Sequence, residues 1–370
     1  MGLDPGRYIF NQPTWPKFRW DATALAPDLA LLAAEEKLLT NKLVYLDPVF
    51  LAELFRVALY EELFNSFYLD DEFLDPSPVK EVLAYKSLAF SDSLAKITLK
   101  DWGSGSDQTL VQNYLNIFLD ARTNPERRLS TKKLDRWRLG LSHSGNLVGL
   151  GSYRPGVYGL SPVSPGPIAY AKEPCPAPEA ARLPREMGRF LNWHNAPWPF
   201  DPVIKAGIAH LWFLIVKPFL GASGRLARLT TELILNDRGP LAGYYSLSRF
   251  IREDRVAYHE ALLKTIMEPS LDITAWLRWF VKILRQAASA ANGRFDMIIN
   301  KAVHWAKATD YPLSEGQRNI LALLGADFIG PLSTERYAKL AKCDLTRAER
   351  ELNQLVSRDL VAPEFFAQRA

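Results

Sequence analysis

Residues that can do chemistry gather in one short stretch of the chain, from Lys217 to Arg228. It reads KPFLGASGRLAR, follows an apolar segment and opens an amphipathic one. Backbone N–H groups at a turn that opens a helix attract anions, and Gly221 and Gly224 permit close backbone approach. Arg225 and Arg228, three residues apart, add two guanidinium groups suited to phosphate or carboxylate. The sequence therefore predicts an anion site. The alternative is an ordinary turn between helices with solvated arginines.

Lys217 begins this stretch and adds a third positive charge to it. An unperturbed lysine titrates near ~10.4, so at neutral pH it is a poor proton acceptor. Burial beside Arg225 would lower its pKa and make it a base, as in catalytic lysines. Without that burial, Lys217 stays protonated and binds a phosphate, diphosphate or carboxylate. Both interpretations fit the sequence.

The elements that position this stretch are predicted to be helices, because apolar residues recur three and four positions apart. Residues 8–20, rich in aromatics and proline, predict an irregular arm. Dense glycine and proline from 140 to 178 allow at most a hairpin. The predicted helices are 27–39, 48–67, a series beginning near Thr109, 184–195, 202–217, 223–236, 246–265, 273–291, 314–324, 334–343 and 346–358.

Composition excludes several classes of protein. The 370 residues are 48% hydrophobic and 23% charged, which is typical of a globular protein with more than one packed unit. The 45 basic and 41 acidic residues are interspersed, so no strong nucleic-acid surface is predicted. Cys175 and Cys343 lack metal-ligand spacing. The longest apolar run, 208–216, is too short for a membrane span, and we expect a cytoplasmic protein.

The stretch resembles the signature of the Fic family, H-P-F-x-(D/E)-G-N-G-R-x-x-R, and residues 209–213 match its usual lead-in. The positions that agree are Pro218, Phe219, Gly224, Arg225 and Arg228. The positions that depart are Lys217 for the histidine, Gly221 for the acid, Ala222 for a glycine and Ser223 for the asparagine. The resemblance implies that Gly221 through Arg225, with Arg228, cradle phosphates. It also implies that the usual proton acceptor and metal-binding acid are lost.

Nearly the whole chain resembles a Fic subfamily that has its own N-terminal helical domain and a closing winged helix. The segments that carry this are Gln12–Pro13, Trp15–Pro16, Arg19–Asp21, Tyr245–Ser248 and Leu271–Thr274. The resemblance implies a mainly α fold: a helical bundle with a small β-hairpin flap, an N-terminal helical domain and a C-terminal winged-helix-like domain. The expected domains are 1–100, 101–292 and 293–370.

Two regulatory features of the family have counterparts in this chain. An inhibitory helix, (S/T)-x-x-x-E-(G/N), is matched by Ser66 to Asp71, with Asp70 at the glutamate position. The resemblance implies that Asp70 pairs with Arg228, although its side chain is one methylene shorter. An acidic helix end is the alternative. The flap corresponds to 153–170, where three prolines limit strand pairing, so a protein target is less assured.

Four further residues are candidates for secondary roles. Tyr244 and Tyr245 precede a helix on the expected nucleotide side, and they either stack a base or pack in the core. His194 and His210 lie in apolar helices, where they are either substitute bases or core histidines. The closing unit, 314–370, has eight basic and eight acidic residues, which favours domain packing or a homodimer over DNA binding.

The function expected from these observations is binding of a phosphorylated or anionic ligand, a nucleotide such as ATP, with altered transferase-type chemistry at Lys217. Because glycine replaces the acid at position 221, we expect magnesium only where the ligand's own phosphates hold it. The alternative is an inactive Fic pseudoenzyme that binds a nucleotide or a partner as a regulator. Protein AMPylation of the usual kind and DNA-binding regulation are further alternatives.

Overall fold

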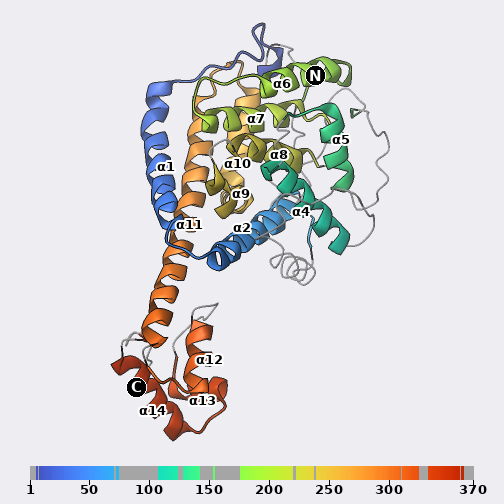
Figure 1. Cartoon of the computed structure of the whole chain (residues 1–370). Coiled ribbons are helices and arrows are strands. Elements are labelled where there is room, and N and C mark those ends of the chain that lie inside the picture. Colours follow the sequence, from blue (N-terminus) through green and yellow to red (C-terminus); the bar gives the residue numbers. More distant parts are fainter. Residues whose placement is uncertain are drawn as a thin grey trace. The chain divides into compact units, whose positions relative to one another are not determined.

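The computed structural model is helical throughout its described residues, apart from loops (Figure 1). It divides into two compact units, Met1–Asn292 and Gly293–Ala370. The structure describes residue 6 and residues 8–70, 72–74, 107–123, 128–141, 153–154, 176–219, 222–236, 239–309, 311–324, 332–358 and 360–361. Among these residues no strand forms, so the expected mainly α fold is confirmed. Gly221 and most of the predicted flap, 155–170, lie outside them.

The first unit is built from helices of very different length. The short 3-10 helices are η2 (Ile9–Asn11), η3 (Ala180–Arg182) and η5 (Pro240–Tyr244). The α-helices are α1 (Ala22–Leu43), α2 (Pro48–Leu69), α4 (Asp107–Thr123), α5 (Thr131–Gly140), α6 (Leu183–Asn195), α7 (Pro202–Val216), α8 (Ser223–Leu235), α9 (Leu247–Glu253), α10 (Arg255–Met267) and α11 (Thr274–Thr309), the last of which continues into the second unit.

Helices α7 and α8 pack against each other at the centre of the first unit (Figure 1). Nearly every residue of α7 is buried, as its apolar sequence PVIKAGIAHLWFLIV requires. Asp201 caps its start by accepting a hydrogen bond from the Val203 N–H. Gly207 lets another helix approach, because a Cβ there would lie 2.8 Å from a methyl carbon of Leu277. The candidate turn therefore connects the two most buried helices of the unit.

Helix α2 lies beside this pair and is anchored to the start of α9. The buried carboxylate of Glu62 accepts hydrogen bonds at 2.8 Å from the Ser246 hydroxyl and the Ser248 backbone N–H, and a further one from the Ser248 hydroxyl. A negatively charged acceptor is stabilised at the N-terminus of a helix, so Glu62 of α2 caps the start of α9. This anchoring fixes the end of α2 that leads to Ser66 and Asp70.

The N-terminal arm is irregular, as predicted, and the rest of the unit holds it in place. The Trp15 indole donates to buried Glu186 at 2.9 Å. The backbone of Arg19 donates to Leu271 and accepts from Ile273, at 2.8 and 2.9 Å, which forms an isolated parallel bridge with Asp272. The arm thus ties the start of the chain to the start of α11.

Three predicted helices differ from the structure. The helix expected over 27–39 runs from Ala22 to Leu43, because Asp21 caps its start by accepting hydrogen bonds from the N–H groups of Thr23 and Ala24. The helix expected over 246–265 is broken into α9 and α10 at Asp254, whose backbone is not helical (φ −108, ψ 32). Its carboxylate instead accepts hydrogen bonds from Trp279 and Lys282. The helix expected over 273–291 runs on to Thr309, so Gly293 lies inside α11 despite the low helix propensity of glycine.

The second unit contains α12 (Glu315–Leu324), α13 (Thr334–Ala341) and α14 (Leu345–Ser357). Helices α13 and α14 are joined by a turn at Lys342, whose φ is 53. A separate core of buried side chains holds the three helices together. Its members include Leu313, Ile320, Leu332, Tyr337, Ala348, Leu352 and Leu355.

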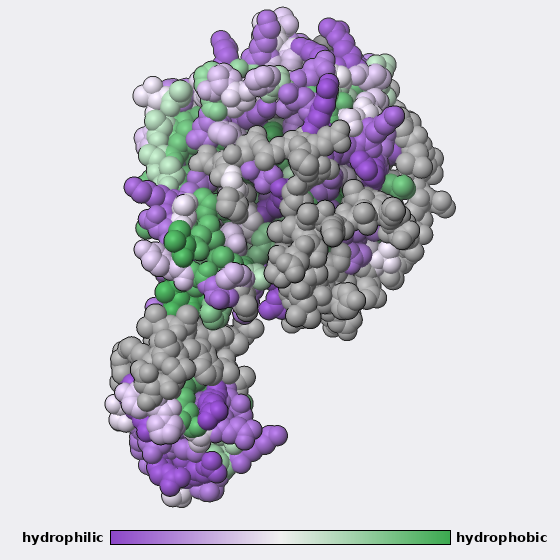
Figure 2. All heavy atoms as spheres, viewed as in Figure 1, coloured by the Kyte–Doolittle hydropathy of each residue, from purple (hydrophilic) through white to green (hydrophobic). Residues whose placement is uncertain are grey.

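The surface of the first unit is mixed, with hydrophobic residues over the side where α1 lies (Figure 2). Large apolar side chains at the end of α1 and just after it are at least half exposed, namely Leu38, Val44 and Tyr45. Within the described part of the chain, no helix is both long and apolar enough to cross a bilayer. Nor do three or more metal-ligating side chains come together among those residues.

Candidate functional site

The candidate site begins where α7 ends. Lys217 has φ 44, in the left-handed region, and its backbone N–H donates to the Phe213 carbonyl at 2.8 Å. Ala222, just before α8, also has a left-handed φ of 51. Each such conformation costs about 1–3 kcal/mol in a residue other than glycine, and these conformations concentrate at functional sites. The turn is thus bounded on both sides by strained backbone.

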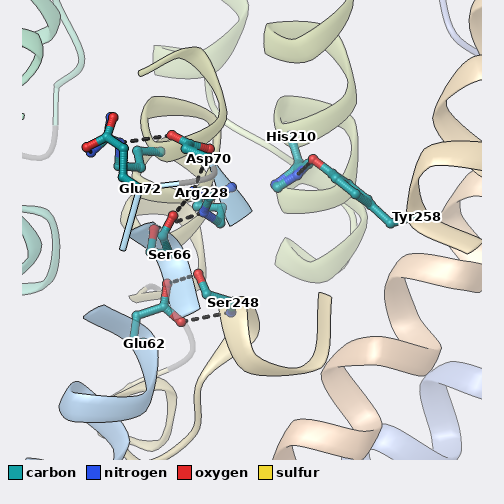
Figure 3. Close-up of polar contacts among 9 residues, drawn as sticks. Glu62, Ser66, Asp70, Glu72, His210, Arg228, Ser248 and Tyr258 are labelled. Carbon is teal, nitrogen blue, oxygen red and sulfur yellow. Dashed lines mark hydrogen bonds and ion pairs between the residues drawn. The ribbon is translucent and has the colours of Figure 1, made fainter. Parts of the chain in front are cut away.

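Helix α8 then presents two buried arginines, Arg225 and Arg228, of which Arg228 is labelled beside Ser66 and Asp70 in Figure 3. Arg225 donates hydrogen bonds to both carboxylate oxygens of Glu72, at 2.9 and 2.5 Å, and its Nε lies 2.9 Å from Asp70 Oδ2. The guanidinium carbon also lies 4.7 Å from the ring centre of Phe67. A fork-shaped donor with two carboxylates against it has the geometry that binds oxyanions.

Arg228 is more deeply enclosed than Arg225. Its Nε donates to the Ser66 hydroxyl at 3.0 Å, and one terminal nitrogen donates to the Ser66 carbonyl at 2.7 Å and to Asp70 Oδ1 at 3.2 Å. Burial alone would lower the pKa of Arg228, but the Asp70 carboxylate raises it above its usual value. The predicted pairing of Asp70 with Arg228 is therefore confirmed, despite the shorter side chain.

Asp70 touches both arginines at once. One oxygen contacts Arg228 and the other contacts Arg225. Gly224 makes room for this carboxylate, since a Cβ at that position would lie 2.7 Å from Asp70 Oδ1. In the structure the two arginines therefore bind two acidic side chains of the same chain, Asp70 and Glu72. An external anion that binds these arginines would have to compete with those two carboxylates.

The remaining predicted site residues fall into different settings. Ser223 is buried, and its hydroxyl donates to the Phe219 carbonyl at 3.0 Å, closing the turn on itself. Lys217 is half-buried. Tyr245 is 2% exposed, which matches the core-packing interpretation, whereas Tyr244 is half-buried with its ring 6.2 Å from that of Phe55. Base stacking by Tyr244 stays a prediction.

Both histidines considered as substitute bases are core residues. His210 contacts the Thr231 hydroxyl at 3.1 Å and the Tyr258 hydroxyl at 3.3 Å, and burial lowers its pKa to about 3 (Figure 3). His194 lies 3.4 Å from the Thr230 carbonyl, and burial lowers its pKa to about 4. Neutral, enclosed imidazoles of this kind match the core-histidine interpretation.

Three residues next to the site were missed from the sequence. Glu72 follows Asp70 by two residues, and the run of acids 70–72 was the available signal for it. Glu62 and Arg154 had no local signal. Their partners lie far along the chain: Ser248 for Glu62 and Lys217 for Arg154.

Comparisons with known proteins bear on the fold that carries this site. A family model described as a domain of unknown function, DUF4172, matches residues 8–87. A Fic family protein from Desulfovibrio desulfuricans G20 superimposes with a TM-score of 0.54 at 19% identity, covering 91% of this chain and 90% of that one.

Two further solved structures agree with this likeness. Fic-1 from C. elegans (aa 134–508) gives a TM-score of 0.52 at 16% identity, over 75% of this chain and 74% of that one. A Fic domain containing signaling protein from Bacteroides thetaiotaomicron VPI-5482 gives 0.50 at 18% identity, over 72% and 96%. Since the likeness is structural and spans most of each chain, the protein has the Fic fold.

Proposed function

We propose that this protein binds a phosphorylated or otherwise anionic small molecule at the turn between α7 and α8, and acts on it by transferase-type chemistry that depends on Lys217. A nucleotide such as ATP is the first ligand to consider. The observation that supports this is the position of Asp70, whose two oxygens contact Arg225 and Arg228. An arrangement that accommodates one bridging oxyanion suits a phosphate of similar shape.

The proposed binding requires that the ligand replace the resident carboxylates. Glu72 is the more accessible of the two, with 31% of its side chain exposed against 18% for Asp70. An arriving anion would therefore displace Glu72 from Arg225 first. Any magnesium would arrive on the ligand's phosphates, because such ions seldom bind without a carboxylate or phosphate partner.

A second candidate function is that of a regulator that binds without turnover. It is favoured by the same carboxylates, since both arginines are neutralised within the chain and the histidine of the family signature is replaced by Lys217. In this candidate, ligand or partner binding opens the contacts of Asp70 and Glu72, and no product forms.

Binding is tested by thermal shift with ATP, ADP, AMP and inorganic phosphate, each with and without magnesium. A ligand at 100 times its Kd stabilises the folded state by about 2.7 kcal/mol. The double change Asp70→Asn and Glu72→Gln removes the competing charges, so we expect the Kd to fall by about tenfold, or about 1.4 kcal/mol. Arg225→Met should abolish binding. An unchanged Kd in the double variant would contradict competition at this site.

Chemistry is tested by product analysis after long incubation with the ligand that binds. The enzyme proposal is supported if the ligand is consumed by the wild type but not by Lys217→Met. Lys264→Met, a change at an exposed lysine of α10, is the control and should still consume the ligand. Unchanged ligand supports the regulator. Transfer of AMP to a protein target, abolished by Lys217→Ala, would instead show the usual Fic activity and overturn the altered chemistry proposed here.

A further inference from the structure

Arg154 is a buried arginine that holds the backbone of the turn from outside it. Its side chain is almost fully enclosed. The Nε donates to the Lys217 carbonyl at 2.7 Å, and one terminal nitrogen reaches the Val216 carbonyl at 3.5 Å. The backbone N–H of the same residue donates to the Pro218 carbonyl at 2.9 Å. Three consecutive carbonyls thus face one residue that lies more than sixty positions earlier in the chain.

Two of these carbonyls, those of Val216 and Lys217, belong to the last residue of α7 and to its C-cap. The last carbonyls of a helix carry partial negative charge, and a guanidinium satisfies several of them at once. Lys217 itself has a left-handed φ, and the Arg154 Nε donates a hydrogen bond to its carbonyl. The same guanidinium donates to the Pro178 carbonyl at 2.5 Å, which ties the turn to the segment before α6.

The next residue of the turn is held from the same side. The Phe219 ring lies 5.9 Å from the ring of Tyr153, stacked at 28°, and 4.7 Å from the Arg138 guanidinium carbon. Residues 153 and 154 together therefore contact the turn from 216 to 219. Lys217 lies between these two contacts, and together they hold the main chain from which its side chain starts.

We propose that Arg154 is a positioning residue for Lys217: by holding the carbonyls of residues 216 to 218, it fixes the direction in which the Lys217 amine leaves the backbone. The inference rests on the proposed function, in which that amine acts on an anion held by Arg225 and Arg228. Arg154 does not belong to the anion site itself, so its role separates from ligand binding.

The first test compares Arg154→Met and Arg154→Lys with the wild type in turnover and in binding. Misplacement of a reacting group by about 1 Å costs about 100-fold in rate. We expect kcat to fall by about that factor in Arg154→Met, with the Kd of the ligand within about twofold, because Arg225 and Arg228 are untouched. Arg154→Lys keeps one charged donor and should restore part of kcat. An unchanged kcat in a folded Arg154→Met variant would overturn the proposal.

The second test does not depend on the proposed activity. Each lysine is acetylated with limiting reagent, and peptide mass spectrometry gives the reaction rate of Lys217 relative to that of exposed Lys264. Release of the turn should change this ratio severalfold in Arg154→Met, and less in Arg154→Lys. If Arg154→Met does not fold, the comparison of Arg154→Lys with the wild type decides, and an equal ratio there overturns the proposal.

Arg182→Met is the matched control for both measurements. Arg182 also donates to a backbone carbonyl, that of Phe10 at 2.7 Å, but it lies on η3 and its other hydrogen bonds go to Asn11 and Glu186, away from the turn. A loss of stability in this variant should leave the Lys217 ratio as in the wild type. The two proposals can fail separately. If the protein shows no turnover but the acetylation rate of Lys217 still depends on Arg154, the proposed chemistry is rejected and the positioning role is supported.

Discussion

At the scale of single residues, the site depends on how closely a carboxylate can approach two guanidinium groups. Asp70 lies 3.2 Å from Arg228 and 2.9 Å from Arg225. This approach is possible because its carboxylate packs against Gly224, which has no Cβ. The glycine is used here for its missing Cβ, because its φ is not in the left-handed region that only glycine adopts readily. Its replacement therefore tests the close approach of Asp70 and Arg228 without adding backbone strain.

Gly224→Ala should disturb this contact. The new Cβ would lie 2.7 Å from Asp70 Oδ1 and 3.2 Å from a terminal nitrogen of Arg228, both enclosed groups with little room to move. Overpacking of this kind costs about 1–3 kcal/mol. Urea unfolding should show that loss in the free energy of unfolding, and the affinity for the anionic ligand should change with it.

Gly188→Ala is the matched control for this prediction. Gly188 also lies in a helix, α6, but a Cβ there meets nothing within 4 Å. Alanine has the higher helix propensity, so this change should stabilise the protein by up to about 1 kcal/mol. Equal effects of the two substitutions would show that Asp70 yields easily and is not held at the site.

The sequence contained the cationic part of this site but only part of its partners. The spacing of Arg225 and Arg228 on one helix predicts that they act together, and the resemblance added Asp70. Glu72 and Arg154 could not be placed, because their contacts join residues 153 and 63 positions apart. Such contacts are set by how helices pack, and no local pattern of residue types encodes that.

At the scale of elements, four helices meet at one buried imidazole. His210 of α7 contacts Thr231 of α8 and Tyr258 of α10. Its ring also lies about 6 Å from those of Trp276 and Phe280 on α11. Protonation of this ring would place an unpaired charge in an apolar setting, which is why burial holds its pKa at about 3.

The stability of the first unit should therefore fall in acid. The folded pKa of His210 lies below the unfolded value near 6.5, so the unfolded chain binds more protons between these values. The contribution of His210 to stability is therefore fully present above about pH 6.5 and declines by up to about 1.4 kcal/mol per pH unit below it. Urea unfolding at several pH values should show a shallower decline in His210→Gln, which cannot titrate. Parallel curves for the two proteins would contradict this account.

Helix positions were predictable from the sequence, and helix interruptions were less so. Apolar spacing located α2, α7 and α8 to within a few residues, because each is amphipathic or wholly buried. The break between α9 and α10 was missed, since it arises when Asp254 binds Trp279 and Lys282 on α11 instead of continuing the helix. Local helix propensity cannot predict such a break, because it depends on contacts with residues that are distant in the sequence.

At the scale of the whole molecule, the chain carries two cores with different chemistry around them. The first unit surrounds the arginines and carboxylates of the candidate site. The second has its own apolar core and one buried polar group of note, Glu351, which accepts hydrogen bonds from Tyr337 and Arg347 at 2.8 and 2.9 Å. This division lets the role of the second unit be tested by changes within it.

Helices α13 and α14 belong to the unit predicted to be winged-helix-like, but the charge of this unit argues against DNA as its partner. Residues 293–370 include eleven basic and ten acidic side chains, and one face of α14 carries both Arg350 and Glu349. Neutralisation of phosphates supplies most of the affinity for duplex DNA, so a balanced surface gains little from it. We expect fluorescence anisotropy at physiological salt to give a Kd weaker than about 10 μM, with a shallow salt dependence. Glu349→Lys is the control, because it should strengthen any DNA binding that uses this face. Tight binding of DNA by the wild type, with a steep salt dependence, would contradict the prediction.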